Sequence, residues 1–417
     1  MATDAANAPD TANTEVSVRQ WRNLGLLALA ELLGLTLWFS SSAVTPAIKA
    51  DWGLTTGETS WLVMAVQIGF VVGTFASGVL NLPDIISARK LFAASAALSA
   101  LSNVGFALLA DGLAEGIAFR LLTGLFLAGV YPPGMKLATT WTVRNRGLAV
   151  GLVVGALTIG SASPHLVRSL VDFDWPQVVL VSSALAALGG AIVFFFVEEG
   201  PFTTRGAKFD PRFLQRMFTD RSLRLANLGY LGHMWELYAM WTWMPVFLLE
   251  VVGEKTILSS FELSKVLTFV VFAAGAVGSV AAGFGSERFG RTRAASAAMI
   301  GSGSIAVFIG FLPDEASVLI VVLAIIWGLT VVADSAQFST AMTELANPSY
   351  IGSALALQTA VGFLLTILSI RLVPIVEAEA GWGVAFAMLA AGPALGTLAM
   401  LRLRQLPEAL AMAGGRR

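Results

Sequence analysis

Long apolar runs constrain this chain more than any other feature. Runs of roughly 20 residues recur from Leu24 to Leu401, separated by short stretches that hold most of the charges. A run of this length, wound as an α-helix, crosses a bilayer core of about 30 Å. The runs lack the alternation of apolar and polar residues that marks membrane-spanning strands, and a helix satisfies its own backbone in lipid. The sequence therefore predicts an all-α integral membrane protein.

Composition supports a membrane environment and removes several function classes. Of the 417 residues, 56% are hydrophobic and 13% are charged, whereas a soluble domain carries about 25% charged residues. A water-soluble fold could not bury so much apolar surface, so membrane lipid is the expected partner. The net charge of −1 gives no reason to expect nucleic acid. The absence of cysteine excludes disulfides, thiol catalysis and thiolate metal sites.

Twelve transmembrane helices are expected from the apolar runs between charge clusters. They lie near residues 23–47, 60–82, 91–110, 114–136, 147–170, 176–197, 225–249, 263–285, 294–312, 317–340, 351–373 and 383–401. Lys and Arg gather in alternate loops, and short basic loops stay in the cytoplasm. We therefore expect a multi-pass protein of the cell (inner) membrane with both termini cytoplasmic. The polar start of the chain has no signal-peptide core.

A long polar stretch separates the first six spans from the last six. It runs from Glu198 to Arg224, is basic, and has the pattern of a short interfacial helix near Pro211 to Phe218. We predict a cytoplasmic tail at 1–22, a six-helix half at 23–197, a cytoplasmic linker at 198–224, a second six-helix half at 225–404 and a cytoplasmic tail at 405–417.

Two loops carry a related motif at the same place in each half. After the eighth span the chain reads Gly283-Phe-Gly-Ser-Glu287-Arg288-Phe-Gly290-Arg291-Thr-Arg293, which resembles the loop signature G-x-x-x-D-R-x-G-R-R of the major facilitator superfamily (MFS). After the second span, Gly78-Val-Leu-Asn-Leu-Pro-Asp84-Ile-Ile-Ser-Ala-Arg89-Lys90 keeps the acid and the trailing bases but lacks the central Arg-x-Gly. The resemblance implies the MFS fold, which is built from two duplicated six-helix halves.

Two spans of the first half add weaker matches. Arg120-Leu-Leu-Thr-Gly124 resembles the R-x-x-Q-G element of the family. Gly151, Gly155, Gly160 and Pro164 partly match an antiporter signature, although the closing Gly-Gly is absent. Glycines in a span also allow close helix packing, so both readings stay open.

The motif loops suggest a conformational latch. A carboxylate in such a loop can bond to arginines or to helix ends across the cytoplasmic face, which stabilises one closed state. The alternative is that these bases serve only the orientation of the protein. The residues expected in this latch are Asp84, Arg89, Glu287, Arg288 and Arg291.

Ionisable side chains inside the spans are the strongest functional candidates, because each one is costly in lipid unless it meets a partner or a watery cavity. They are Glu31, Arg120, His165, His233, Glu236 and Asp334. In the MFS architecture the first, fourth, seventh and tenth spans line a central cavity, and five of these six lie on them. A buried carboxyl group holds its proton more tightly than one in water, which suits Glu31 and Glu236 to proton coupling. A buried structural tie is the alternative for each acid.

Other residues complete the expected substrate or proton pathway. Trp38, Tyr238 and the neighbouring tryptophans could stack on an organic substrate or on a cation, and Gln337 lies close to Asp334 in the sequence. His233, Glu236, Met240 and Met244 share one helical face. A copper site built from His233, Met240 and Met244 is a minor alternative, because imidazole and thioether ligands suit copper(I).

These observations predict a secondary active transporter of a small solute, working by alternating access and coupled to protons. No nucleotide-binding motif occurs, so we expect no ATP drive, no cofactor and no enzymatic activity. The alternatives are an efflux antiporter for organic or drug-like compounds, a copper importer, and a membrane receptor or channel. We expect a monomer. The substrate and the direction of transport stay open.

The topology can be tested because the chain lacks cysteine. One cysteine introduced within the linker 198–224 and another replacing Asp314 should be labelled differently by an impermeant thiol reagent added to intact cells. We expect labelling at Asp314→Cys and none in the linker, since the linker is predicted to be cytoplasmic. The reverse pattern would exclude this topology.

Overall fold

The computed structural model describes residues 8–170, 174–203, 211–252 and 260–417. These residues form helices and turns, with no strand among them. The first half contains α1 (Ala8–Leu35), α2 (Ser40–Asp51), α3 (Thr56–Val79), α4 (Leu82–Ile85), α5 (Ala88–Leu109), α6 (Leu113–Leu127), α7 (Tyr131–Thr140), α8 (Arg146–Leu170) and α9 (Trp175–Phe196).

The second half follows a short helix in the connecting segment, α10 (Pro211–Thr219), where the sequence predicted one. It contains α11 (Arg221–Val252), α12 (Ser260–Phe289), α13 (Arg291–Phe308), η1 (Ile309–Phe311), η2 (Asp314–Ala316), α14 (Ser317–Ala333), α15 (Ser335–Leu345), η3 (Pro348–Tyr350), α16 (Ile351–Leu389), α17 (Ala391–Arg404) and η4 (Pro407–Gly415). α16 holds two crossings, because Gly381 leaves helical geometry with a φ of 77° and turns the chain back.

Twelve crossings result. Nine segments of the described chain are long and apolar enough to span a membrane, and the last of them contains both crossings on either side of Gly381. The pair α1–α2 and the long helix α11 supply the remaining two. The spans predicted from the apolar runs therefore match the observed helices in number and order.

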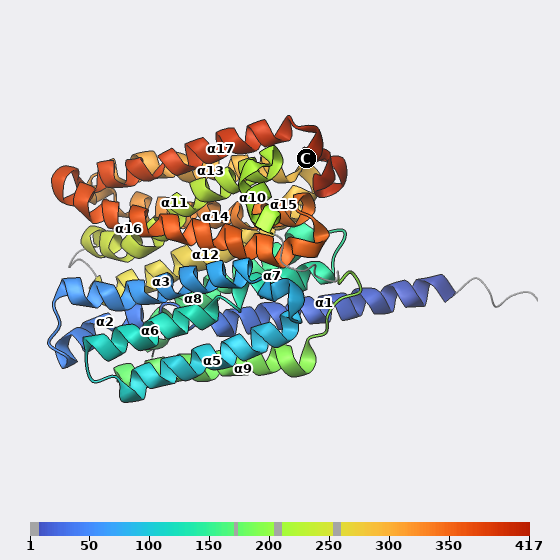
Figure 1. Cartoon of the computed structure of the whole chain (residues 1–417). Helices are drawn as coiled ribbons and strands as arrows, with labels where there is room; N and C mark the ends of the chain where they lie inside the picture. The colour runs from blue at the N-terminus through green and yellow to red at the C-terminus, as the bar shows by residue number, and fades with distance from the viewer. Residues whose placement is uncertain (1–7, 171–173, 204–210, 253–259) are drawn as a thin grey trace, which may run out of the picture.

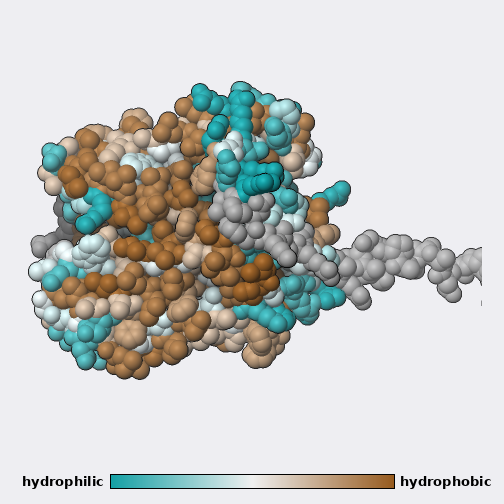
Figure 2. Space-filling model, in the orientation of Figure 1, coloured by the Kyte–Doolittle hydropathy of each residue, from teal (hydrophilic) through white to brown (hydrophobic). Residues whose placement is uncertain are grey.

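The helices run roughly parallel in one bundle, with the first half on one side and the second half on the other (Figure 1). Hydrophobic residues form a broad band across the middle of the face shown, and hydrophilic residues gather towards its two ends (Figure 2). The start of α1 and the end of the chain lie at the same end of the bundle (Figure 1). We call it the basic end, after Arg19, Arg22, Arg146, Arg291 and Arg404.

Three crossings that the sequence predicted as continuous are interrupted near the middle of the bundle. The first breaks between Leu35 and Ser40, the fourth between Leu127 and Tyr131, and the tenth at Asp334. In the fourth, Pro132 and Pro133 fall in the first turn of α7, where a missing backbone N–H is tolerated. Each break frees backbone groups that lipid cannot satisfy.

Glycines bring helices into close contact at equivalent places in the two halves. A Cβ atom at Gly124 on α6 would lie 1.9 Å from the carbonyl oxygen of Val66 on α3, and one at Gly278 on α12 would lie 1.9 Å from that of Leu329 on α14. Such close backbone approach is typical of small residues at helix interfaces in membranes. It shows that both halves use the same packing between their second and fourth crossings.

This packing predicts opposite effects for two glycine-to-alanine changes. Gly124→Ala places a methyl group against a backbone oxygen that cannot move freely, so we expect a loss of about 1–3 kcal/mol in stability. Gly285→Ala on α12 meets no atom within 4 Å and removes backbone freedom, so we expect no loss or a gain of up to about 1 kcal/mol. Thermal unfolding of both variants in detergent measures the difference, and equal midpoints would contradict the close contact.

Candidate functional site

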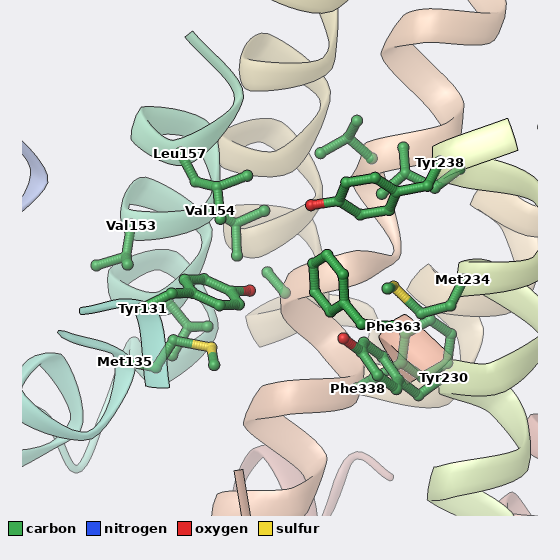
Figure 3. Close-up of a cluster of buried hydrophobic side chains, with 14 of the residues drawn as sticks. Tyr131, Met135, Val153, Val154, Leu157, Tyr230, Met234, Tyr238, Phe338 and Phe363 are labelled. Carbon is green, nitrogen blue, oxygen red and sulfur yellow. The ribbon is translucent and has the colours of Figure 1, made fainter. Parts of the chain in front are cut away.

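A small cavity lies between the two halves, at the level of the helix breaks. Tyr131 and Tyr238 reach towards it from opposite halves, and Phe363 lies between them (Figure 3). The cavity is nearly closed, because the volume open to the centre of a water molecule is only about 20 Å³. Its lining comprises Tyr131, Val154, Leu157, Thr158, Tyr230, Met234, Leu237, Tyr238, Trp241, Val332, Ser335 and Phe363.

An aromatic layer crosses from one half to the other beside this cavity. The ring of Trp38 lies 4.9 Å from that of Phe70 and 5.1 Å from that of Phe363. The ring of Tyr238 lies 4.6 Å from Phe363 and 5.4 Å from Trp241. These centroid distances and tilted geometries are those that aromatic pairs prefer. Tyr238 on α11 and Trp38 in the turn between α1 and α2 therefore meet at the interface of the halves, with ring centroids 6.0 Å apart.

Arg120 serves the first half and does not face the cavity. Its guanidinium is fully buried and donates to the carbonyl oxygens of Leu37 and Trp38, at 3.3 and 3.0 Å. It also donates to Ser40 Oγ at 3.1 Å and to Asn103 Oδ1 at 2.7 Å. These acceptors lie at the break between α1 and α2, so Arg120 satisfies the freed carbonyls and fixes the backbone that carries Trp38.

Glu31 is fully buried and is not among the described residues that line the cavity. Neither of its carboxyl oxygens has a hydrogen-bond partner among the described residues. Oε2 lies close to Gly134, where an added Cβ would stand 2.6 Å away, and Gly134 is on α7 with Tyr131. An ionised carboxylate without a partner in such a place is very costly. In this conformation Glu31 is therefore best accommodated as the neutral acid.

His233 and Asp334 form a buried pair in the second half. Nδ1 of His233 on α11 lies 2.7 Å from Oδ1 of Asp334, and both side chains are at least 98% buried. Asp334 is the residue at which the tenth crossing breaks, and the next residue, Ser335, lines the cavity. The pair thus joins α11 to the helix break beside the cavity. Gln337 is also buried, and its side-chain amide has no partner among the described residues.

Glu236 lies inside the second half, away from the cavity lining. Its Oε1 accepts a hydrogen bond from Trp327 Nε1 on α14, and its Oε2 accepts one from Ser302 Oγ on α13, both at 2.8 Å. Met240 and Met244 are fully buried further along α11. His233 is thus paired with Asp334, whereas Glu236 is hydrogen-bonded to residues of α13 and α14. The described residues contain no group of three or more His, Asp or Glu suited to a metal ion.

One predicted residue, His165, lies outside the side chains that the structure describes.

The motif acid of the first half binds the second half at the basic end. Asp84 accepts hydrogen bonds from the backbone N–H groups of Gly352 and Ser353, at 3.0 and 2.7 Å, at the start of α16. Lys136 donates to the same carboxylate at 2.5 Å. A helix N-terminus favours negative charge, so this contact combines an ion pair with a capped helix end.

The motif acid of the second half makes the reciprocal contact. Glu287 Oε1 accepts from the backbone N–H of Gly147 at the start of α8, at 2.7 Å, and lies 2.7 Å from Arg291. Arg291 also pairs with Glu344 at 2.9 Å, and Arg146 donates to the carbonyl oxygen of Thr343 at 3.3 Å. Each loop thus holds the first turn of a helix in the opposite half.

Two residues expected in the latch lie outside these contacts. Arg89 reaches the carbonyl oxygen of Val197 in its own half, at 3.5 Å, and Arg288 is exposed beside Phe289. Sequence reasoning missed Lys136, Glu344 and Arg146, which complete the two contacts. The sequence held one indication for Lys136, because a lysine at the edge of an apolar run needs a partner or water.

Comparison with known families gives one match over most of the chain. A sequence model described as the Major Facilitator Superfamily matches residues 27–370. The chain is 24% identical to the MFS-type transporter pytF of Aspergillus terreus, over 70% of this chain and 97% of that one. It is 25% identical to the niacin transporter NiaP of Acinetobacter baylyi, over 64% and 66% of the two chains. The gallate transporter of Pseudomonas putida is 24% identical over 74% and 75%.

Solved structures share the fold. The proton:xylose symporter XylE superposes with a TM-score of 0.72 at 16% identity, covering 93% of this chain and 96% of that one. The human organic anion transporter MFSD10 gives a TM-score of 0.70 at 16% identity, covering 91% and 99%. The predicted fold of twelve helices in two six-helix halves is therefore confirmed.

Proposed function

The chain belongs to the major facilitator superfamily and is a multi-pass membrane transporter of small solutes, and we propose that it works by alternating access coupled to protons. The family and the fold are those of transporters rather than enzymes. The relatives named as niacin and gallate transporters support a small organic solute as cargo.

The buried pair of His233 and Asp334 is the observation that carries proton coupling. The two groups attract each other strongly only when the imidazole is protonated, the carboxyl group is ionised and water is excluded. A proton taken up by Asp334 removes that attraction and leaves a neutral acid at the break between α14 and α15. Because Ser335 lines the cavity, water that enters between the halves reaches the pair. Proton uptake then loosens the tenth crossing from α11.

Glu31 is the second proton site in this proposal, because it occupies a similar place in the first half. Glu31 lies behind Tyr131, as His233 lies behind Tyr230, whose ring centroid is 6.0 Å from that of the imidazole. Glu236 fits the role less well, since hydrogen bonds from Ser302 and Trp327 hold both of its oxygens inside the second half.

The two reciprocal contacts at the basic end support the latch. Asp84 and Glu287 each accept a hydrogen bond from a helix N-terminus of the opposite half. Both hydrogen bonds therefore break when the halves separate at this end. We place this end in the cytoplasm of an inner-membrane protein, following the distribution of Lys and Arg. The conformation described is then closed towards the cytoplasm.

Asp334→Asn tests proton coupling without knowledge of the substrate. Pairs of spin labels on the two halves, attached to introduced cysteines, report the distance between the halves in liposomes from acidic to alkaline pH. We expect the distance distribution of the unsubstituted protein to change with pH, and that of Asp334→Asn to change much less, because asparagine cannot take up the proton and only Glu31 is left to respond.

Glu236→Gln is the matched control, since it makes the same acid-to-amide change on α11. It should keep the pH response. A response that persists in Asp334→Asn but disappears in Glu236→Gln would move the proton site to Glu236.

Glu287→Gln tests the latch at the basic end. Glutamine still accepts a hydrogen bond from Gly147 but loses the charge that binds Arg291. A charge-assisted hydrogen bond contributes about 1.5–3 kcal/mol, so we expect at least a tenfold shift towards conformations open at the basic end. The same spin-label distances measure the shift.

Glu58→Gln serves as the control, because Glu58 caps α3 within one half through Thr55. It should leave the distances unchanged. Identical distances in Glu287→Gln and the unsubstituted protein would remove Glu287 from the latch.

A further inference from the structure

We propose that the central cavity takes an uncharged aromatic solute that carries a hydroxyl or carbonyl group. This inference names the substrate class of the proposed transport site and rests on that proposal. It comes from the chemistry of the side chains that line the cavity and from the charged groups that do not.

None of the described side chains that line the cavity is charged. Its polar groups are the hydroxyls of Tyr131, Thr158, Tyr230, Tyr238 and Ser335 and the indole N–H of Trp241, which has no hydrogen-bond partner among the described residues. The other lining side chains are apolar. An ion that moves from water into such a place loses its hydration and gains no counter-charge, which is strongly unfavourable. A neutral solute loses far less. The lining therefore selects against organic anions, and to an organic cation it offers only the faces of its rings in place of water.

The charged groups nearby are already engaged elsewhere. Arg120 donates to backbone and amide oxygens at the first helix break, and Lys136 is bound to Asp84 at the basic end. His233 and Asp334 face each other, with Nδ1 and Oδ1 2.7 Å apart, and neither of them lines the cavity. Glu31 lies behind Tyr131 without a hydrogen-bond partner, as suits a neutral carboxyl group. Among the described residues, a charged solute would thus find no free counterion at the cavity.

The lining is unusually rich in aromatic rings. The chain has four tyrosines, and three of them line the cavity together with Trp241 and Phe363. Trp241 stacks on Phe272 with centroids 4.7 Å apart and planes 21° apart, and its neighbour Tyr238 packs edge-on. Flat aromatic surfaces favour a flat aromatic guest over a puckered one of equal size.

Hydroxyl groups supply the polar recognition. Tyr131 and Tyr238 point their hydroxyls into the space between the halves from opposite sides (Figure 3). Tyr131 contacts the hydroxyls of Ser335 and Ser339, whereas the Tyr238 hydroxyl bonds to none of the described residues. A buried phenol normally finds a partner. A hydroxyl or carbonyl group on the solute would provide one.

The test compares four fluorinated probes of similar size by ligand-observed fluorine NMR on the full chain in detergent micelles. The probes are 4-fluorophenol, 4-fluorocyclohexanol, 4-fluorobenzoate and 4-fluorobenzylammonium, and empty micelles give the partitioning background. We expect 4-fluorophenol to bind at least several-fold more tightly than each of the others. Tighter binding of either charged probe would overturn the proposal, as would equal binding of the phenol and the cyclohexanol.

Tyrosine-to-phenylalanine variants locate the binding. Tyr238→Phe keeps the ring and removes one hydroxyl, so 4-fluorophenol should bind up to about tenfold more weakly. If Tyr238→Phe does not fold, the same binding measurement is made on Tyr131→Phe. The matched control is Tyr350→Phe, because Tyr350 stacks on Phe213 outside the cavity lining. Unchanged binding in both cavity variants, or no binding above empty micelles, would refute the proposal.

The two proposals fail in different ways. If 4-fluorophenol does not bind but the pH response is present and Asp334→Asn weakens it, the proposed substrate class is refuted and proton-coupled alternating access still stands. If 4-fluorophenol binding depends on Tyr238 but the protein shows no pH response, proton coupling is refuted and the substrate class stands.

Discussion

Lipid offers no hydrogen bonds, and this constraint governs the middle of the molecule. A continuous helix satisfies its own backbone, but three crossings break at the level of the cavity and each break must be satisfied by side chains. Arg120 does this for the first crossing by donating to the carbonyl oxygens of Leu37 and Trp38. Its cost of burial is offset by four acceptors rather than by an acid. Arginine is well suited to the task, because its planar group donates in several directions at once.

The same logic at the basic end produces two contacts related by the internal repeat. Asp84 and Glu287 each meet backbone N–H groups of the opposite half, where a helix N-terminus would otherwise present unpaired donors. The last residues of the chain pack onto the second of these contacts. Ala413 donates its backbone N–H to Glu344, and Arg416 donates to the carbonyl oxygen of Glu287. Gly290, with a φ of 95°, admits the backbone of residues 416 and 417 where a side chain would collide.

Much of the fold could be predicted from the sequence, because span length and loop charge depend only on local composition. The number and order of the crossings follow from apolar runs, and the motif acids follow from the repeat. The breaks could not be read this way. Leu35 to Ser40 contains no proline, and its interruption is stabilised by Arg120 and Asn103, which lie more than sixty residues further along the chain. Hydropathy alone cannot show such a long-range contact.

The candidate site was predictable in kind but not in arrangement. His233, Glu236 and Asp334 are equally strong candidates in the sequence, because each is an ionisable residue inside a span. Only their neighbours in the folded structure distinguish the role of one from that of another. Trp327 and Ser302 each donate a hydrogen bond to one carboxyl oxygen of Glu236, whereas His233 and Asp334 face each other. Helical spacing places His233 and Glu236 on one face of α11, but that face turns towards other helices of its own half. A pattern on one helix cannot tell which neighbour it meets.

The arrangement separates the protonable groups from the cavity by one layer of side chains. Glu31 lies behind Tyr131, and the pair of His233 and Asp334 lies behind Tyr230 and beside Ser335. In the proposed mechanism, a proton therefore acts on a bound solute through the helices that carry these residues, and not by direct contact. Helix breaks make this transmission possible, because α7 and α15 can pivot where the backbone is already interrupted, while continuous helices would resist bending. Coupling and recognition then place different demands on the chain. Coupling needs buried charge at the breaks, whereas the lining can stay neutral and adapt to its solute.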